Sequence, residues 1–192
     1  MPIPKLISFS SFLQPQVDLI SKELPNFKPY YNNTSTITFQ VPANIIPSSL
    51  QMVCGFYFSP ILIEVTLTFK NPSWTLPLSS FSATHPVFGQ NYIGRPLIQE
   101  TIRNFFTASY KPKPQYRCSQ NLLPSLHLTY GTSPLLYLLL EIVDSFIDIQ
   151  DHCCICHKPL HFSVIKPSIC EKRLCEVSFN EIGVGTSVSQ EI

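Results

Sequence analysis

The cysteines are the residues with the most evident chemistry in this sequence, because five of the seven lie within the 23 residues from 153 to 175. Cys153 and Cys156 form a C-x-x-C pair, and Cys170 and Cys175 form a second pair with four residues between them. Zinc prefers four ligands at the corners of a tetrahedron, and two short-spaced thiolate pairs joined by a loop can supply them. The sequence therefore predicts a closed, structural zinc site.

The choice of ligands is less well defined than the site, because several other donors lie next to the two pairs. Cys154 can replace Cys153, and an imidazole can replace a thiolate. The neighbouring histidines are His152, His157 and His161. Two further interpretations are open: unconnected buried or free cysteines, and a redox-active C-x-x-C pair, although no βαβ pattern precedes it. The preferred ligand set is Cys153, Cys156, Cys170 and Cys175.

Length and composition limit the remaining function classes. The 192 residues and the 44% hydrophobic content suit one domain with at most a small appendage. A net charge of +1 does not favour a nucleic-acid partner. The six glycines form neither a G-x-G-x-x-G fingerprint nor a G-x-x-x-x-G-K-[ST] loop, which excludes these two nucleotide-binding devices.

The compartment follows from the N-terminus and from the longest apolar run. Residues 1–16 contain one lysine, a short apolar stretch broken by serines and no small-residue cleavage site, so no secretory signal is expected. Residues 135–143 are about half of the roughly 20 that a membrane span needs. We expect a cytoplasmic or nuclear protein without a membrane partner. Thiols stay reduced there, which favours metal binding over disulfides.

The elements that must position the cysteines begin with a helix over residues 14–24, with Pro15 in its first turn. Alternating hydrophobicity then predicts strands over residues 36–41, 50–58 and 61–70, each with one apolar face, and the first and third also with one polar face. A short edge strand over residues 74–78 is a further possibility. The short connections favour an antiparallel meander.

Two helices follow these strands. The first starts at Pro96, and its apolar positions recur at helical spacing: Ile98, Ile102, Phe105 and Phe106. The second has Ser133 as N-cap and Pro134 in its first turn. It is apolar except for a narrow polar stripe: Tyr137, Glu141, Asp144 and Asp148. We expect it to be mostly buried. The order of elements predicts an α+β fold with helices on one face of the sheet.

Two other features suggest chemistry more weakly. Cys118, beside Arg117, could be an activated nucleophile, but no patterned base accompanies it, so an ordinary cysteine is favoured. Residues 110–117 are basic, aromatic and rich in proline, and could clamp an acidic partner or a nucleic-acid strand. Because the chain is nearly neutral, a solvated linker loop is favoured instead.

The order of elements resembles the RWD and ubiquitin-conjugating-like folds, in which a proline segment follows the third strand, as residues 71–77 do here. The run from His85 to Phe106 and the cysteine segment with its tail resemble the region upstream of the catalytic domain in a branch of the poly(ADP-ribose) polymerase (PARP) family. In that branch a C-x-x-C…C-x-x-x-x-C…E-x-G-x-G pattern precedes an ADP-ribosyltransferase domain. The resemblance covers residues 60–192.

The resemblance implies an RWD- or ubiquitin-conjugating-like domain over residues 1–150 and a zinc module over residues 151–192, cut before a transferase domain. The four preferred cysteines carry over as metal ligands. The catalytic residues and the NAD pocket belong to the absent domain, so no catalytic or cofactor-binding residue is assigned, and we expect this chain to be inactive alone. The implied function is recruitment of a protein partner or substrate for an ADP-ribosyltransferase. The alternative is a stand-alone, zinc-containing RWD-like adaptor of the ubiquitin pathway.

Overall fold

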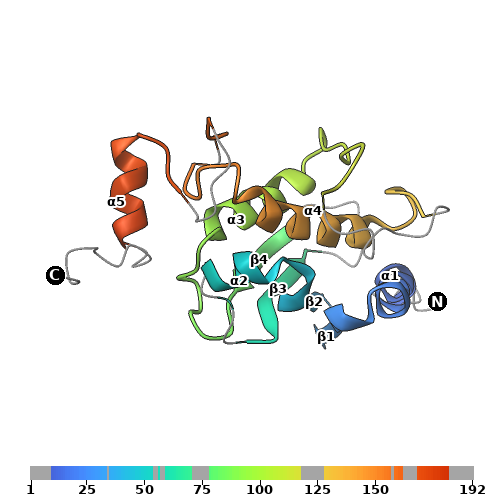
Figure 1. Cartoon of the computed structure of the whole chain (residues 1–192). Helices are drawn as coiled ribbons and strands as arrows, with labels where there is room; N and C mark the ends of the chain where they lie inside the picture. The colour runs from blue at the N-terminus through green and yellow to red at the C-terminus, as the bar shows by residue number, and fades with distance from the viewer. Residues whose placement is uncertain are drawn as a thin grey trace, which may run out of the picture.

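The computed structural model describes residues 10–33, 35–53, 56, 59–70, 78–117, 128–156, 158–161 and 168–181 (Figure 1). Its elements are α1 (Ser10–Glu23), β1 (Tyr30–Asn33), β2 (Thr36–Pro42), α2 (Ser48–Val53), β3 (Ile61–Phe69), β4 (Leu78–Thr84), α3 (Arg95–Phe105), α4 (Pro134–Asp148) and α5 (Arg173–Glu181). Two single-turn 3₁₀ helices, η1 (Pro25–Phe27) and η2 (Ala43–Ile45), flank β1 and β2.

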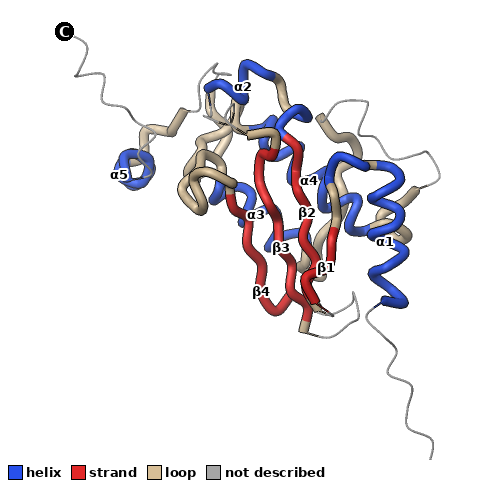
Figure 2. Tube along the Cα trace, turned by 90° about the horizontal axis from the view of Figure 1, so that it is seen from below, coloured by secondary structure: helices blue, strands red, loops and turns tan. Residues whose placement is uncertain are grey.

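The strands form one sheet in the order β1-β2-β3-β4, and every neighbouring pair is antiparallel. This is the predicted meander. Helices α3 and α4 lie side by side against one face of the sheet, and α1 lies at its β1 side (Figure 2). One hydrophobic core joins α1, the sheet, α3 and α4. The predicted α+β class is therefore confirmed.

The alternation of β3 is confirmed by its burial, since Ile63, Val65 and Leu67 are fully buried while Thr66 between them is not. The expectation for β2 is only partly right. Its apolar face is buried, but Thr36 and Thr38 on the other face are buried too. Their hydroxyls hydrogen-bond across the strands to Thr68 and Thr66, at 3.3 and 3.1 Å. Cross-strand pairing satisfies these hydroxyls without water.

The strand predicted over residues 50–58 is wrong in its described part, because residues 48–53 form α2. Leu50 is 1% exposed and Met52 is 68% exposed. Residues two apart share a face in a strand but point in nearly opposite directions in a helix, so this difference is helical. Pro47 starts the helix, since its carbonyl accepts the amide of Gln51 at 3.0 Å. Residues 54, 55, 57 and 58 lie outside the described residues.

Two strand boundaries also differ from expectation. Residues 25–33, for which the sequence predicts no strand, contain η1 and then β1, which begins at Tyr30 and pairs with β2. Of the possible edge strand over residues 74–78, only Leu78 is described, and it is the first residue of β4. The edge position is right, while the strand itself runs on to Thr84.

The helix predicted over residues 14–24 is present but begins at Ser10, so Pro15 lies inside α1 and not in its first turn. Proline inside a helix removes one amide hydrogen bond. The burial of Leu13, one turn before Val17, offsets this loss and extends the helix.

The two later helices match their predictions closely. α3 starts one residue before Pro96 and buries Ile98, Ile102 and Phe105. Ser133 is the N-cap of α4, although its side chain makes no capping hydrogen bond. α4 is mostly buried, as expected. In the described part of the chain no helix is both long and apolar enough to cross a membrane.

Candidate metal centre

The first cysteine pair lies on a short loop that follows α4. The amide of Cys153 donates to the carbonyl of Lys158 at 2.9 Å, and the amide of Leu160 donates to the carbonyl of Asp151 at 2.8 Å. His152 and Pro159 form an isolated antiparallel bridge. These bonds close a tight turn around residues 153–156, so the side chains of Cys153 and Cys156 are held near each other.

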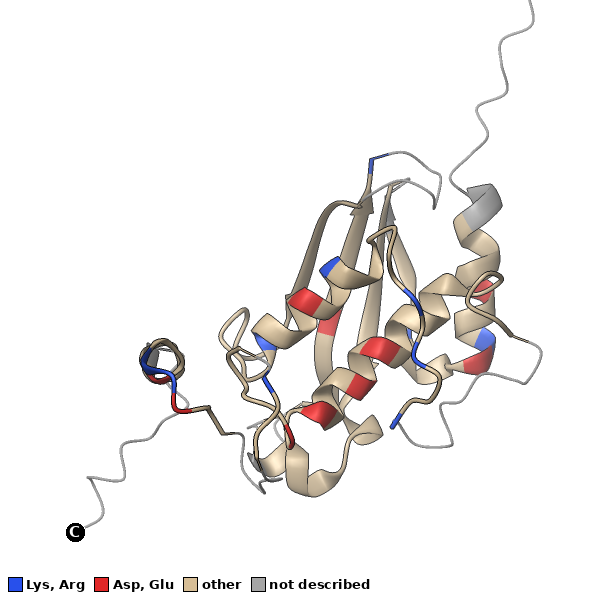
Figure 3. Cartoon of the chain, turned by 90° about the horizontal axis from the view of Figure 1, so that it is seen from above, with Lys and Arg blue, Asp and Glu red and all other residues tan. Residues whose placement is uncertain are grey.

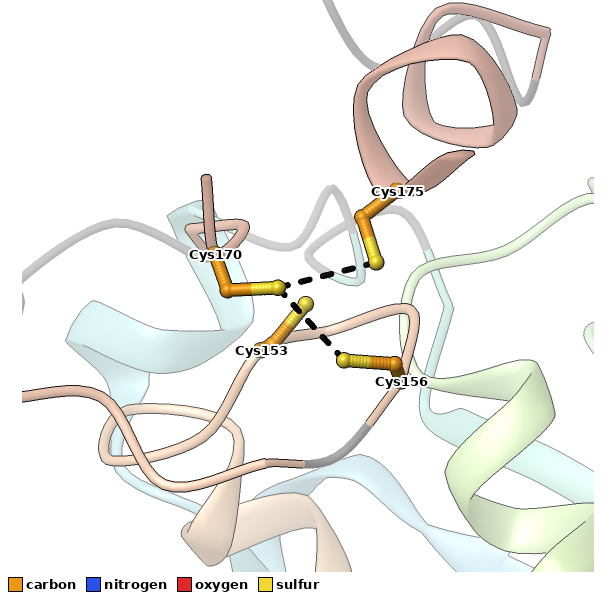
Figure 4. A group of neighbouring side chains, drawn as sticks. All are labelled: Cys153, Cys156, Cys170 and Cys175. Carbon is orange, nitrogen blue, oxygen red and sulfur yellow. Dashed lines mark hydrogen bonds between the residues drawn. The ribbon is translucent and has the colours of Figure 1, made fainter. Parts of the chain in front are cut away.

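The second pair comes from the segment that leads into α5. The amide of Cys154 donates to the carbonyl of Ser168 at 3.0 Å, which fixes this segment against the first loop. Cys170 lies two residues after Ser168. Cys175 lies in the first turn of α5, where its amide donates to the carbonyl of Lys172 at 2.8 Å. Figure 4 shows the four side chains converging from the two segments on one point.

The four sulfur atoms are close enough to share one metal ion, because all of them lie within 4.8 Å of one another. The Sγ of Cys170 is 3.5 Å from that of Cys156 and 3.7 Å from that of Cys175. A tetrahedral ion with metal–sulfur bonds of about 2.3 Å requires sulfur–sulfur spacings of about 3.8 Å. The thiols are free, with no disulfide among them. Cys153, Cys156, Cys170 and Cys175 could thus hold a metal ion.

The surroundings favour the thiolate form at one corner of this group. Burial opposes ionisation of Cys153, but main-chain hydrogen bonds from Cys156, Cys170 and Ile155 bring the pKa of its thiol down to about 7. Burial instead raises the pKa of Cys175 to about 12. A bound cation deprotonates a coordinating thiol outright, so the ion would supply the charge that Cys175 lacks by itself.

The alternative ligands lie elsewhere, or outside the described residues. Cys154 is buried in the main hydrophobic core, and burial raises the pKa of its thiol to about 12. The Nδ1 of His152 lies 3.0 Å from the carbonyl oxygen of Asp148. His161 is exposed, and His157 is outside the described residues. Within the described residues, the structure groups only the four preferred cysteines.

The basic and aromatic segment 110–117 lies against the polar stripe of α4 (Figure 3). The ammonium group of Lys113 lies 2.5 Å from Asp144, 3.4 Å from Asp148 and 3.8 Å from Glu141. Although burial lowers its pKa, the hydrogen bond to Asp144 holds the pKa of Lys113 above its usual value. Lys113 therefore stays charged and offsets part of the negative charge of the stripe.

Two tyrosines and an arginine complete this contact. The hydroxyls of Tyr110 and Tyr116 donate to Glu141 at 2.7 and 2.9 Å. Arg117 pairs with Asp148 at 3.1 Å and with Asp151, at the start of the cysteine loop. The expectation of a solvated linker loop is therefore only partly right, because the segment is a loop with exposed residues but these side chains meet carboxylates of the same chain. The acidic stripe in the sequence already indicated such a contact, since acidic groups on a buried helix require partners.

His85, which begins the run that carries the family resemblance, makes contacts within the fold. His85 is buried, and its Nδ1 accepts the amides of Val87 and Phe88, both at 3.1 Å. It stacks on Phe56 with ring centroids 5.2 Å apart, and burial lowers its pKa. This histidine holds a turn together. Cys118 lies outside the described residues.

The comparisons give this chain no named relative: no family model, no curated protein and no solved structure matches it.

Proposed function

We propose that this chain is a non-catalytic protein-interaction module whose C-terminal part is folded around a structural zinc ion. The observation that carries the zinc assignment is the convergence of four cysteine sulfurs within 4.8 Å. Soft thiolate ligands in a tetrahedral set of four favour zinc. Four protein ligands leave no position for water or substrate, so such a site stabilises structure and does not catalyse.

The burial pattern of the C-terminal part supports a structural role for the ion. Helix α5 exposes 82% of Leu174 and 48% of Val177, so it has little apolar burial to hold it in place. Structural zinc contributes an apparent binding free energy of about 10–16 kcal/mol to small domains, which compensates for such a weak core. The ion would thereby fix α5 against the rest of the chain.

Metal analysis tests the site. The chain, purified without added metal, should contain about one equivalent of zinc. Cys153→Ala should lose it, whereas the matched variant Cys154→Ala should keep it, because Cys154 lies in the core and outside the sulfur group. Less than about half an equivalent of zinc in the native chain, or equal zinc loss in both variants, contradicts the assignment.

The setting that we propose for this module is a PARP-like ADP-ribosyltransferase, with an RWD- or ubiquitin-conjugating-like domain that recruits a partner or substrate. Two observations support it: the four cysteines that carry the resemblance lie together, and an antiparallel meander precedes two helices packed on one face. Reading the coding frame beyond Ile192 is the test. A downstream transferase domain is expected, and a natural stop directly after Ile192 excludes this setting.

A stand-alone adaptor of the ubiquitin pathway is the second candidate, and the closed cysteine group fits it equally well. It predicts partner binding that does not depend on NAD. Affinity purification with the native chain as bait, with and without NAD, tests whether a partner binds independently of NAD. The reading frame beyond Ile192 then separates the two candidates, because only the first expects a downstream transferase domain. Recovery of no partner under either condition contradicts both.

A further inference from the structure

The outer strand of the sheet at its α3 side is β4, and no described strand lies beyond it (Figure 2). Every second N–H and C=O group of an edge strand points away from the sheet and is free to pair with another chain. β4 stays in continuous register with β3 from Ser80 to Thr84, and the one irregularity lies between Leu78 and Ser80. Five consecutive residues therefore present a regular edge.

A groove of about 460 Å³ lies between the first half of β4 and α3, so the regular edge begins in the groove and continues beyond it. Its strand wall consists of Leu78, Ser79, Ser80 and Phe81, and its helix wall of Gln99, Ile102, Arg103 and Phe106. Ile102 is fully buried in the core, so the floor of the groove is apolar and fixed in place. One wall thus presents main-chain groups to an extended peptide, while the other presents side chains.

Arg103 gives this groove its charge. Its guanidinium carbon lies 5.7 Å from the centroid of the Phe81 ring, an arrangement that holds the side chain over the groove. Among the described residues Lys113 and Arg117 are paired with carboxylates, whereas Arg103 has no such partner. Because a guanidinium binds a carboxylate through two parallel hydrogen bonds, the groove is complementary to an acidic side chain.

The opposite edge of the sheet lacks these properties. β1 has only four residues, and its register with β2 breaks between Tyr31 and Asn33. Helix α1 also lies at that side (Figure 2). Breaks in register and short strands are devices that prevent pairing at an edge. β1 is thus an internal control for any experiment on β4.

We infer that the groove between β4 and α3 binds an extended peptide segment of a partner protein, which adds to the sheet beside β4 and places an Asp or Glu against Arg103. Main-chain pairing gives such complexes affinity, and side-chain pockets give them specificity. The inference deepens the proposed function and rests on it, because it names the surface through which the module recruits its partner.

The test uses the full, zinc-loaded chain and a display library of random eight-residue peptides. Enriched peptides should alternate apolar with polar side chains and carry one acidic residue. In hydrogen exchange a synthesised winner should protect amides of residues 78–84 and leave residues 30–33 unchanged. Arg103→Glu should weaken its binding at least tenfold, whereas Lys22→Glu, a charge reversal of the same sign on exposed Lys22 of α1, should have no effect.

Each of three results with peptides overturns the inference: no enriched peptide, no protection of residues 78–84, or equal affinity of the native chain and Arg103→Glu. Concentration-dependent protection of β4 in the chain alone assigns the edge to a second copy, which also overturns it. No cysteine of the metal group lines the groove. Partner binding on another surface therefore removes this inference and leaves the proposed function standing. A zinc-free native chain contradicts the zinc assignment in the proposed function and does not concern the groove.

Discussion

Residues 10–149 and residues 151–181 bury their side chains in different ways. In the first region, called here the body, a continuous apolar core includes α4, of which 12 of 15 residues are buried. In the second, the cysteine module, the buried side chains among the described residues are those of Cys153, Cys154 and Cys175, and Leu174 of α5 points into solvent. Hydrophobic burial can specify the body, whereas the module as we propose it depends on four ligands that meet at one metal ion.

The two regions nevertheless share a boundary. Cys154 belongs to the core of the body, and Ile155, Ile169 and Phe179 pack against that core. The module is therefore attached by a few apolar contacts and by the pair of Arg117 with Asp151. The comparison teaches that one group of metal ligands can order a small segment when a larger domain beside it provides a few packing contacts.

Removal of the metal should have the largest effect, and only on the module. A strong chelator should abolish hydrogen-exchange protection in residues 151–181, because a bound zinc ion would supply about 10–16 kcal/mol of apparent binding free energy there. Trypsin should then cut at Lys172 and Arg173 much faster. Protection in β3 should not change. Simultaneous loss of protection in both regions would show that the body also depends on the ion.

A cavity in the core of the body should have the next largest effect, and it should destabilise the body and leave the zinc site of the module intact. Leu139→Ala removes a fully buried side chain of α4 and should lower the free energy of unfolding by about 2–5 kcal/mol. Urea denaturation followed by circular dichroism measures it. Met52→Ala, at an exposed position, should change stability by less than about 0.5 kcal/mol. Loss of zinc from Leu139→Ala below its unfolding transition would argue against two separate sources of stability.

A glycine at the boundary tests how tightly the body supports the module. Gly94 has φ +83°, and a Cβ there would lie 2.6 Å from Cδ1 of Ile149, just before the cysteine loop. Gly94→Ala should cost about 2–4 kcal/mol from left-handed strain and crowding together. Gly89 also has positive φ, but open space surrounds its Cβ position. Gly89→Ala should thus cost only about 1–2 kcal/mol. Thermal unfolding of both variants measures the difference, and equal decreases in melting temperature would contradict the predicted crowding of Ile149 at position 94.

The contact of segment 110–117 with α4 should show the smallest effect. A double-mutant cycle with Lys113→Met and Asp144→Asn should give a coupling free energy of about 1–2 kcal/mol, reduced by the partial exposure of Lys113. Thermal unfolding at low and at 1 M salt measures the coupling and its screening. A coupling near zero would mean that this segment follows the packing of its tyrosines and not the charges.

Features set by local spacing could be predicted from the sequence. The alternation over residues 61–70, the apolar face of α3 and the burial of α4 all appear as expected, because strand and helix periods fix which residues share a face. The two cysteine pairs could be identified for the same reason: ligands with two to four residues between them can reach one ion without long-range information.

Features that depend on a distant partner required the tertiary structure. Spacing could not separate Cys153 from its neighbour Cys154; the turn closed by Lys158 and the pairing with Ser168 send one sulfur to the metal group and the other into the core. Likewise, the sequence showed a basic segment and an acidic stripe, but only the fold brought Lys113 to Asp144, 31 residues away. Periodicity determines which face of an element is apolar or charged, and contacts between elements determine what covers that face.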